Sequence, residues 1–154
     1  MLVWLTEWQV AEDLTVIRAG DVVDWTLVEA DRAWLSRLFA ERVRVDWQLD
    51  TYADATEQPS RRVRGHVLDV RSVRCRQITT NEGRVPRPGA ATLTVVDDTS
   101  GSWKREPNAA AEETGHGHSY STFGYYGEAV ENDAHEHLYG YLVTVRLGDD
   151  GVAG

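Results

Sequence analysis

Cysteine, lysine and long apolar runs are all scarce in this chain of 154 residues. The single cysteine, Cys75, excludes an internal disulfide and a zinc site built from several cysteines. The chain contains one lysine, Lys104, and fifteen arginines, and this bias towards arginine suggests a GC-rich bacterial genome. No apolar run approaches the roughly 20 residues of a membrane-spanning helix, and the first residues do not resemble a signal peptide. These absences predict a soluble cytoplasmic protein that does not enter the membrane.

The chain also lacks the short motifs of common enzyme classes. It contains no glycine-rich phosphate loop, no His-Glu-x-x-His, and no recognisable spacing of a nucleophile, a base and an orienting acid. We therefore expect a binding or interaction module without catalysis, although the sequence does not decide whether the protein is an enzyme.

Charge is unevenly distributed along the chain, whose net charge is −9. Residues 1–60 hold twelve acidic and five basic side chains, and residues 88–154 hold eleven acidic and three basic ones. Residues 61–87, the basic segment, hold eight arginines against two acidic side chains. An acidic protein repels phosphate at long range, which argues against binding to nucleic acid or membranes. The net charge instead favours a basic protein partner, as in immunity proteins that cover toxins.

The pentapeptide Val-Asp-Trp-x-Leu occurs twice, at Val23–Leu27 and Val45–Leu49. Each copy has Val, Trp and Leu at alternating positions, which lie on one face of a β-strand. Between the copies, Asp31 can cap a helix over Arg32–Arg42, because apolar side chains recur there with a helical period. The pentapeptides thus predict two half-buried strands joined by a helix.

The remaining chain predicts further strands at 2–9, 64–78, 92–96 and 138–147. In the second of these segments, Arg64–Ile78, the apolar phase slips by one between Val70 and Val73, which indicates a β-bulge. The last places Tyr139, Tyr141, Val143, Val145 and Leu147 on one face. We expect residues 81–89 to form a loop. The fold class is therefore mainly β, a small barrel or sandwich of six to eight strands with one helix near 31–42. Residues 1–147 are expected to form a single domain, and residues 148–154 a flexible tail.

Two His-x-His pairs are the first candidate site. His116 and His118 form one pair, and His135 and His137 form the other. Histidines at i and i+2 on an extended segment point to one side and can share a metal ion. If the pairs converge, they predict a divalent metal and, as the alternative function, a metal-dependent enzyme. The competing interpretation, which we favour, is a solvated polar loop.

The basic segment is the second candidate. Arg74 and Arg76 share a face of a regular strand, and the expected bulge can displace Arg71. Arginine forks suit carboxylate or phosphate, so these three residues form a candidate anion site. Internal pairing with the acidic remainder of the chain is the favoured alternative. The aromatic side chains near the second His pair, Tyr139 and Tyr141 among them, can line a pocket but more often build a β core.

Three short motifs resemble an uncharacterised family of small actinobacterial proteins. They are Val3-Trp4 with Trp8-Gln9, then Gly20-Asp21-x-Val23-x-Trp25-x-Leu27, and finally Gly140-Tyr141-Leu142-Val143. Members of that family carry a Cys-Cys-Gly element soon after Trp-Gln, whereas this chain has Ala11-Glu12-Asp13 there. The resemblance implies a β-rich single domain and no particular activity.

Overall fold

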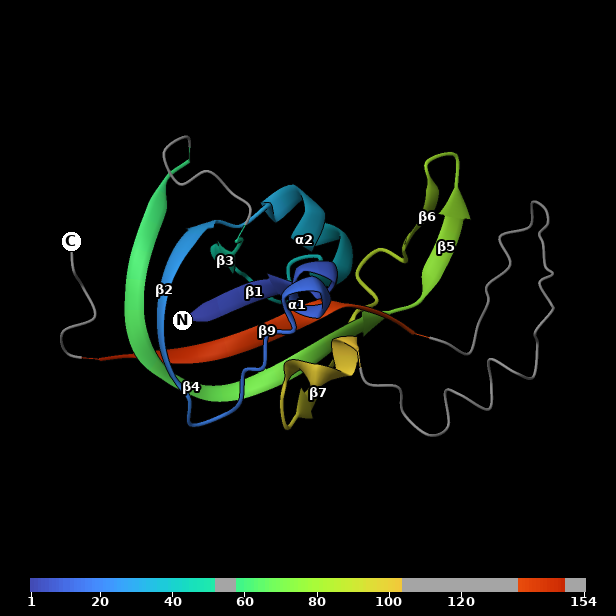
Figure 1. Ribbon diagram of the computed structural model, residues 1–154. Coiled ribbons are helices and arrows are strands. Elements are labelled where there is room, and N and C mark those ends of the chain that lie inside the picture. Colours follow the sequence, from blue (N-terminus) through green and yellow to red (C-terminus); the bar gives the residue numbers. More distant parts are fainter. Residues whose placement is uncertain (52–57, 104–135, 149–154) are drawn as a thin grey trace.

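The computed structural model describes residues 1–51, 58–103 and 136–148, and these are mainly β-strand (Figure 1). The strands are β1 (Leu2–Thr6), β2 (Val22–Glu29), β3 (Trp47–Leu49), β4 (Ser60–Cys75), β5 (Gln77–Thr80), β6 (Gly83–Pro86), β7 (Thr92–Val96) and β9 (His137–Leu147). The helices are α1 (Glu7–Asp13), α2 (Arg32–Phe39) and a short 3-10 helix, η1 (Thr99–Ser102). The predicted mainly β class with six to eight strands is confirmed. The described residues also contain no helix that is long and apolar enough to cross a membrane.

Five strands pair in a closed ring. Strand β1 pairs in parallel with β3 and antiparallel with β9, while β2 pairs antiparallel with β3 and β4. The pairing of β4 with β9 closes the ring, and β7 extends the sheet from the far end of β4. Figure 1 shows β4 curving around the molecule so that its two ends meet different strands. Strands β5 and β6 form a separate two-stranded hairpin that projects beside α2.

Along β1, β9 and the last part of β4 the sheet is buried on both faces, so it separates two apolar cores. Val3, Leu5, Tyr141 and Val143 belong to the core inside the ring, which we call the ring core. Their alternating neighbours, Trp4 and Leu142, belong to the second core on the opposite face. Helix α2 covers this second core with three buried side chains: Leu35, Leu38 and Phe39.

Two β-bulges interrupt the pairing of β4 with β9. Val67 and Asp69 pair with consecutive residues of β9, so Leu68 is the extra residue and is 48% exposed. Val73 pairs with Gly140 and Arg74 with Leu138, so Tyr139 is the extra residue on β9. The bulge expected between Val70 and Val73 is therefore wrong, because the register between them is regular. Val70 faces one core and Val73 the other, so the apolar phase slip marks a strand that is buried on both faces there.

Three predicted elements differ from the structure. The expected first strand, 2–9, ends at Thr6, and α1 follows because Gln9 and Val10 then bury their side chains. The strand predicted around the second pentapeptide is limited to Trp47–Leu49. The expected loop at 81–89 contains β6, which pairs with β5 through a turn whose Gly83 has φ +100°. Most of the predicted tail, residues 149–154, lies outside the described residues.

Candidate functional site

Only one of the four candidate metal-binding histidines lies within the described residues. His137 begins β9, and its ring centroid lies 4.7 Å from that of Tyr139. His116, His118 and His135 fall in the range 104–135, outside the described residues. Across residues 1–51, 58–103 and 136–148 no group of three potential metal ligands is found. Convergence of the two His pairs therefore stays a prediction.

The three candidate anion-binding arginines have different surroundings. Arg71 lies beside Asp69, with its Nε 3.4 Å from Oδ1, and Arg74 donates from Nη1 to the carbonyl of Glu136 at 3.4 Å. Val70 packs in the ring core and Val73 in the second core, so the residues that follow them point to opposite faces of the sheet.

Arg76 follows the end of β4 and is exposed, and its carbonyl accepts a hydrogen bond from the N–H of Arg87. Arg71 and Arg74 do not share a face of β4, because Val70 and Val73, which precede them, face different cores. Whether any of the three arginines binds an anion stays a prediction.

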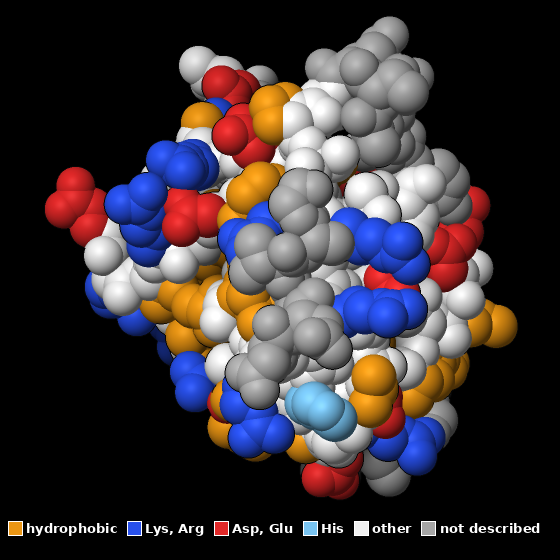
Figure 2. All heavy atoms as spheres, turned by 90° about the vertical axis from the view of Figure 1, so that its left-hand side faces the viewer, with side chains coloured by type: hydrophobic (Ala, Val, Ile, Leu, Met, Phe, Trp, Pro, Cys, Tyr) orange, Lys and Arg blue, Asp and Glu red, His pale blue; other side chains and the backbone are white. Residues whose placement is uncertain are grey.

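Two other arginines of the basic segment pair with a single acidic side chain of β2, Asp24. Arg62 donates from Nε and Nη2 to the two carboxylate oxygens of Asp24, both at 2.8 Å, and Arg64 donates from Nε at 2.8 Å. Figure 2, which faces the β2 and β4 side, shows basic side chains spread over this surface with acidic ones among them. On this face, internal charge pairing occupies Arg62 and Arg64.

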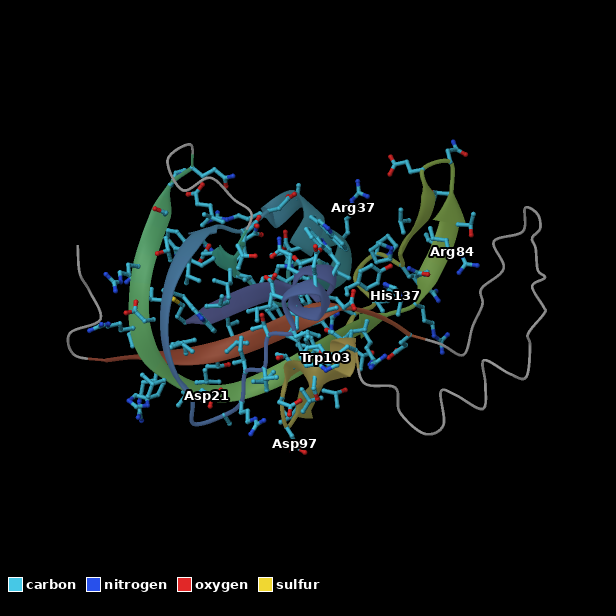
Figure 3. The ribbon with its side chains drawn as sticks, in the orientation of Figure 1. Asp21, Arg37, Arg84, Asp97, Trp103 and His137 are labelled. Atoms are coloured by element: carbon cyan, nitrogen blue, oxygen red, sulfur yellow. The ribbon has the colours of Figure 1, made fainter. Side chains whose placement is uncertain are left out.

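A cavity of about 410 Å³ lies between α2, the β5–β6 hairpin and β9. It combines aromatic, basic and acidic side chains with small apolar ones. Its lining residues are Asp31, Ala33, Trp34, Arg37, Arg84, Val85, Pro86 and Tyr139. In Figure 3 Arg37 lies on the α2 side and Arg84 on the hairpin side, with His137 below them on β9. We refer to this cavity as the hairpin pocket.

Helix α2 and its N-cap supply one wall of the hairpin pocket, because three of the residues that line the pocket recur at intervals of three along the sequence. Asp31, Trp34 and Arg37 therefore lie along one side of the helix, next to the buried Leu35 and Leu38. The Asp31 carboxylate caps the helix by accepting a hydrogen bond from the N–H of Trp34 at 3.0 Å. The same cap that starts α2 thus fixes the position of the Trp34 backbone.

The bulge at Tyr139 supplies the pocket floor. Without an extra residue, Tyr139 would follow the alternation of Tyr141 and Val143 into the ring core; instead it packs against the second core. Its ring lies 5.5 Å from that of Trp34 with an interplanar angle of 84°, and its hydroxyl accepts a hydrogen bond from Gln77 Nε2 at 3.0 Å. Burial raises the pKa of the Tyr139 phenol, so this group stays neutral at ordinary pH.

Positive charge gathers at the hairpin side of the pocket. Partial burial and the positive charges of Arg74 and Arg84 lower the pKa of His137. Arg37 lies 3.6 Å from Glu82, but both side chains are more than half exposed, so this ion pair contributes little stability. The pocket lining therefore combines two arginines, Arg37 and Arg84, and one acidic residue, Asp31, with the two aromatic rings.

The sequence indicated this site only in part. The basic segment contains Arg84, and Tyr139 was named as a candidate pocket residue, but Trp34 and Arg37 were assigned to a helix without a binding role. The N-cap at Asp31 was the available signal, because it sets which side chains of α2 share a face. The bulge that turns Tyr139 towards them has no local signature in residues 138–147.

Comparison with known proteins gives one match. Residues 1–147 match the model of a family described as "Family of unknown function (DUF6578)". No curated protein and no solved structure matches the chain.

Proposed function

Because the chain belongs to the DUF6578 family, whose function is unknown, we propose a function from its own geometry: it binds a small anionic molecule in the hairpin pocket, without catalysis. The observation that supports this proposal is the position of Arg37 and Arg84 on two walls of one cavity. Arginine presents several N–H donors in a planar fork that matches carboxylate and phosphate oxygens. A cavity of about 410 Å³ also falls in the size range of small-molecule sites.

The net charge of the whole chain opposes this proposal at long range, but the local charges favour it. The field of a protein with net charge −9 repels anions. Salt at physiological concentration screens exposed charges beyond about 8 Å, so nearby arginines dominate inside the pocket. An anion that displaces Glu82 from Arg37 breaks only an exposed ion pair, which costs little.

The setting of this binding module is part of the proposal. A cytoplasmic location is supported by the lone cysteine, Cys75, which is buried and free. An actinobacterial source is supported by the resemblance of the three short motifs, and a GC-rich bacterial genome by the arginine-rich composition. The ligand is a small molecule, and a basic protein partner is not needed to account for the pocket.

The direct test is calorimetric titration of the protein with pyrophosphate at low ionic strength. Arg84→Gln and Arg37→Gln each remove one charged donor, and we expect each to weaken binding about tenfold. Arg32→Gln is the matched control, because Arg32 also lies on α2 but donates to Asp46 at 2.7 Å instead of lining the pocket. This control is expected to bind as the unaltered protein does.

Two results contradict the proposal. One is that neither pyrophosphate nor an organic phosphate ester binds. The other is binding that survives both pocket substitutions but is lost in Arg71→Gln, Arg74→Gln or Arg76→Gln. The second result would place the anion site on the arginines of the strand predicted from the sequence.

A further inference from the structure

We propose that the ligand of the hairpin pocket is a flat aromatic anion, meaning an aromatic or heteroaromatic ring that carries a phosphate or carboxylate. This inference rests on the proposed function, because it specifies which anions the pocket prefers. The evidence for it is that Trp34 and Tyr139 line the same cavity as Arg37 and Arg84.

Trp34 and Tyr139 form a right-angled aromatic corner. Their ring planes meet at 84° with centroids 5.5 Å apart, so one ring turns its edge to the face of the other. Both side chains are only partly buried, and both line the cavity. A flat ring placed in this corner stacks on the face of one aromatic ring and turns its own edge to the face of the other. Offset-stacked and edge-to-face contacts are the two favoured arrangements of aromatic rings.

Strand β6 forms the wall opposite α2. Val85 and Pro86 line the pocket there, and their side chains have no strong hydrogen-bonding group. Val85 pairs with Ile78 and Pro86 with Gln77, so the backbone of this wall is fixed by the hairpin. A ligand ring is therefore enclosed between aromatic and aliphatic surfaces, an environment that favours a flat apolar body over a hydrated sugar or free phosphate.

The charged residues give the ligand a direction. Asp31 and Arg37 are six residues apart on α2, which corresponds to about 9 Å along a helix axis. The acidic side chain therefore lies at one end of the helical wall and the basic one at the other. The anionic group of the ligand belongs on the Arg37 side, away from Asp31 and within the two walls that hold Arg37 and Arg84, and its ring extends along Trp34. Ala33 is the smallest lining side chain on α2 and leaves space for that ring.

The test compares two phosphate esters that differ in aromaticity: phenyl phosphate and cyclohexyl phosphate. They have the same charge and carbon number, so a difference in affinity reports on the ring. We expect phenyl phosphate to bind the unaltered protein about fivefold more tightly, within the range of aromatic pair contacts. Titrations are followed by calorimetry and by the NMR shift of the Trp34 indole N–H.

Substitution of Trp34 or Tyr139 measures how much the aromatic corner contributes to the difference in affinity between the two esters. We expect Trp34→Leu to bring the two affinities to within about twofold of each other, because the flat surface is lost while both arginines remain. Tyr139→Leu is the second variant and is expected to reduce the preference as well. Trp8→Leu is the control, since Trp8 is 52% exposed on α1 and does not line the pocket.

The outcomes separate this inference from the proposed function. Equal affinities in the unaltered protein, with binding that still depends on Arg84, would overturn the aromatic preference and leave anion binding intact. A preference that persists in both Trp34→Leu and Tyr139→Leu would also overturn it. If neither ester nor pyrophosphate binds, the proposed function itself is wrong.

Discussion

Gly140 determines how closely β9 can approach β1. A Cβ at this position would lie 2.7 Å from two atoms of the Trp4 ring and closer still to the carbonyl oxygen of Leu5. Because that oxygen belongs to the backbone of a paired strand, it cannot move without disturbing the ring of strands. Gly140 therefore allows the Trp4 side chain to cover the second core next to the Tyr139 bulge.

We predict that Gly140→Ala lowers the free energy of unfolding by about 1–3 kcal/mol, as overpacking of a tight core does. Urea denaturation measures the change. Gly148→Ala is the matched control, because no atom lies within 4 Å of a Cβ built there and its change should be close to zero. An equal effect of the two substitutions would contradict the close approach of β1 and β9.

Asp24 gives the stability a defined dependence on pH. Hydrogen bonds from Arg62 and Arg64 hold the pKa of its carboxyl well below the ordinary value near 4. The unfolded chain therefore takes up a proton at Asp24 at a higher pH than the folded chain does. The stabilisation is fully present above the ordinary pKa and is lost as the pH falls through the lowered folded value.

We predict that the stability difference between the unaltered protein and Asp24→Asn shrinks as the pH falls from about 5 to about 2. The difference is expected to be constant between pH 6 and 8, because Asp24 is ionised in both the folded and unfolded chain there. Chemical denaturation of both proteins across this range measures it. A difference that stays the same at every pH would show that the contacts of Asp24 with Arg62 and Arg64 do not stabilise the fold.

At the scale of secondary-structure elements, local signals located the strands and helices with regular periods. Strand β7 has the bounds expected for 92–96, and α2 begins after the Asp31 cap as predicted. Helix α2 ends three residues earlier than expected. Beyond it, the Arg42 guanidinium donates to the carbonyls of Gly89 and Ala91, both at 2.9 Å. A tertiary contact that no local pattern records therefore accompanies the early end of the helix.

The errors in element assignment arise where two patterns fit the same residues. Trp4 and Trp8 are four apart, so they satisfy the alternation of a strand and the period of a helix alike. The chain changes from β1 to α1 between them, which leaves Trp4 buried and Trp8 exposed. Tyr139 was misplaced for a different reason: its direction depends on the register of β9 against β4, two strands more than 60 residues apart.

At the scale of the whole molecule, the ring and the hairpin differ in how they are held. Strand β4 pairs with β2, β7 and β9, whereas the hairpin strands β5 and β6 pair only with each other among the described residues. The hairpin is joined to the remainder by the Gln77 bond to Tyr139 and the Arg37 ion pair with Glu82, while the bond from the N–H of Arg87 to the carbonyl of Arg76 closes its base. An isolated two-stranded hairpin is marginally stable in water, so local opening should begin there.

We predict that hydrogen exchange is at least about tenfold faster at the β5–β6 amides than at those of β9 in the ring. A ligand in the hairpin pocket contacts α2 and β6 together, so it must lower the population of the open hairpin by mass action. Saturating phenyl phosphate is therefore expected to slow exchange in 77–86 and to leave exchange in 141–145 unchanged. The Arg84→Gln protein, in which the ligand is weakly bound, should show little of this protection at the same ligand concentration. Equal exchange rates in the two elements without ligand would mean that the hairpin opens only with the whole fold, and the pocket would then be a rigid cavity with no moving wall.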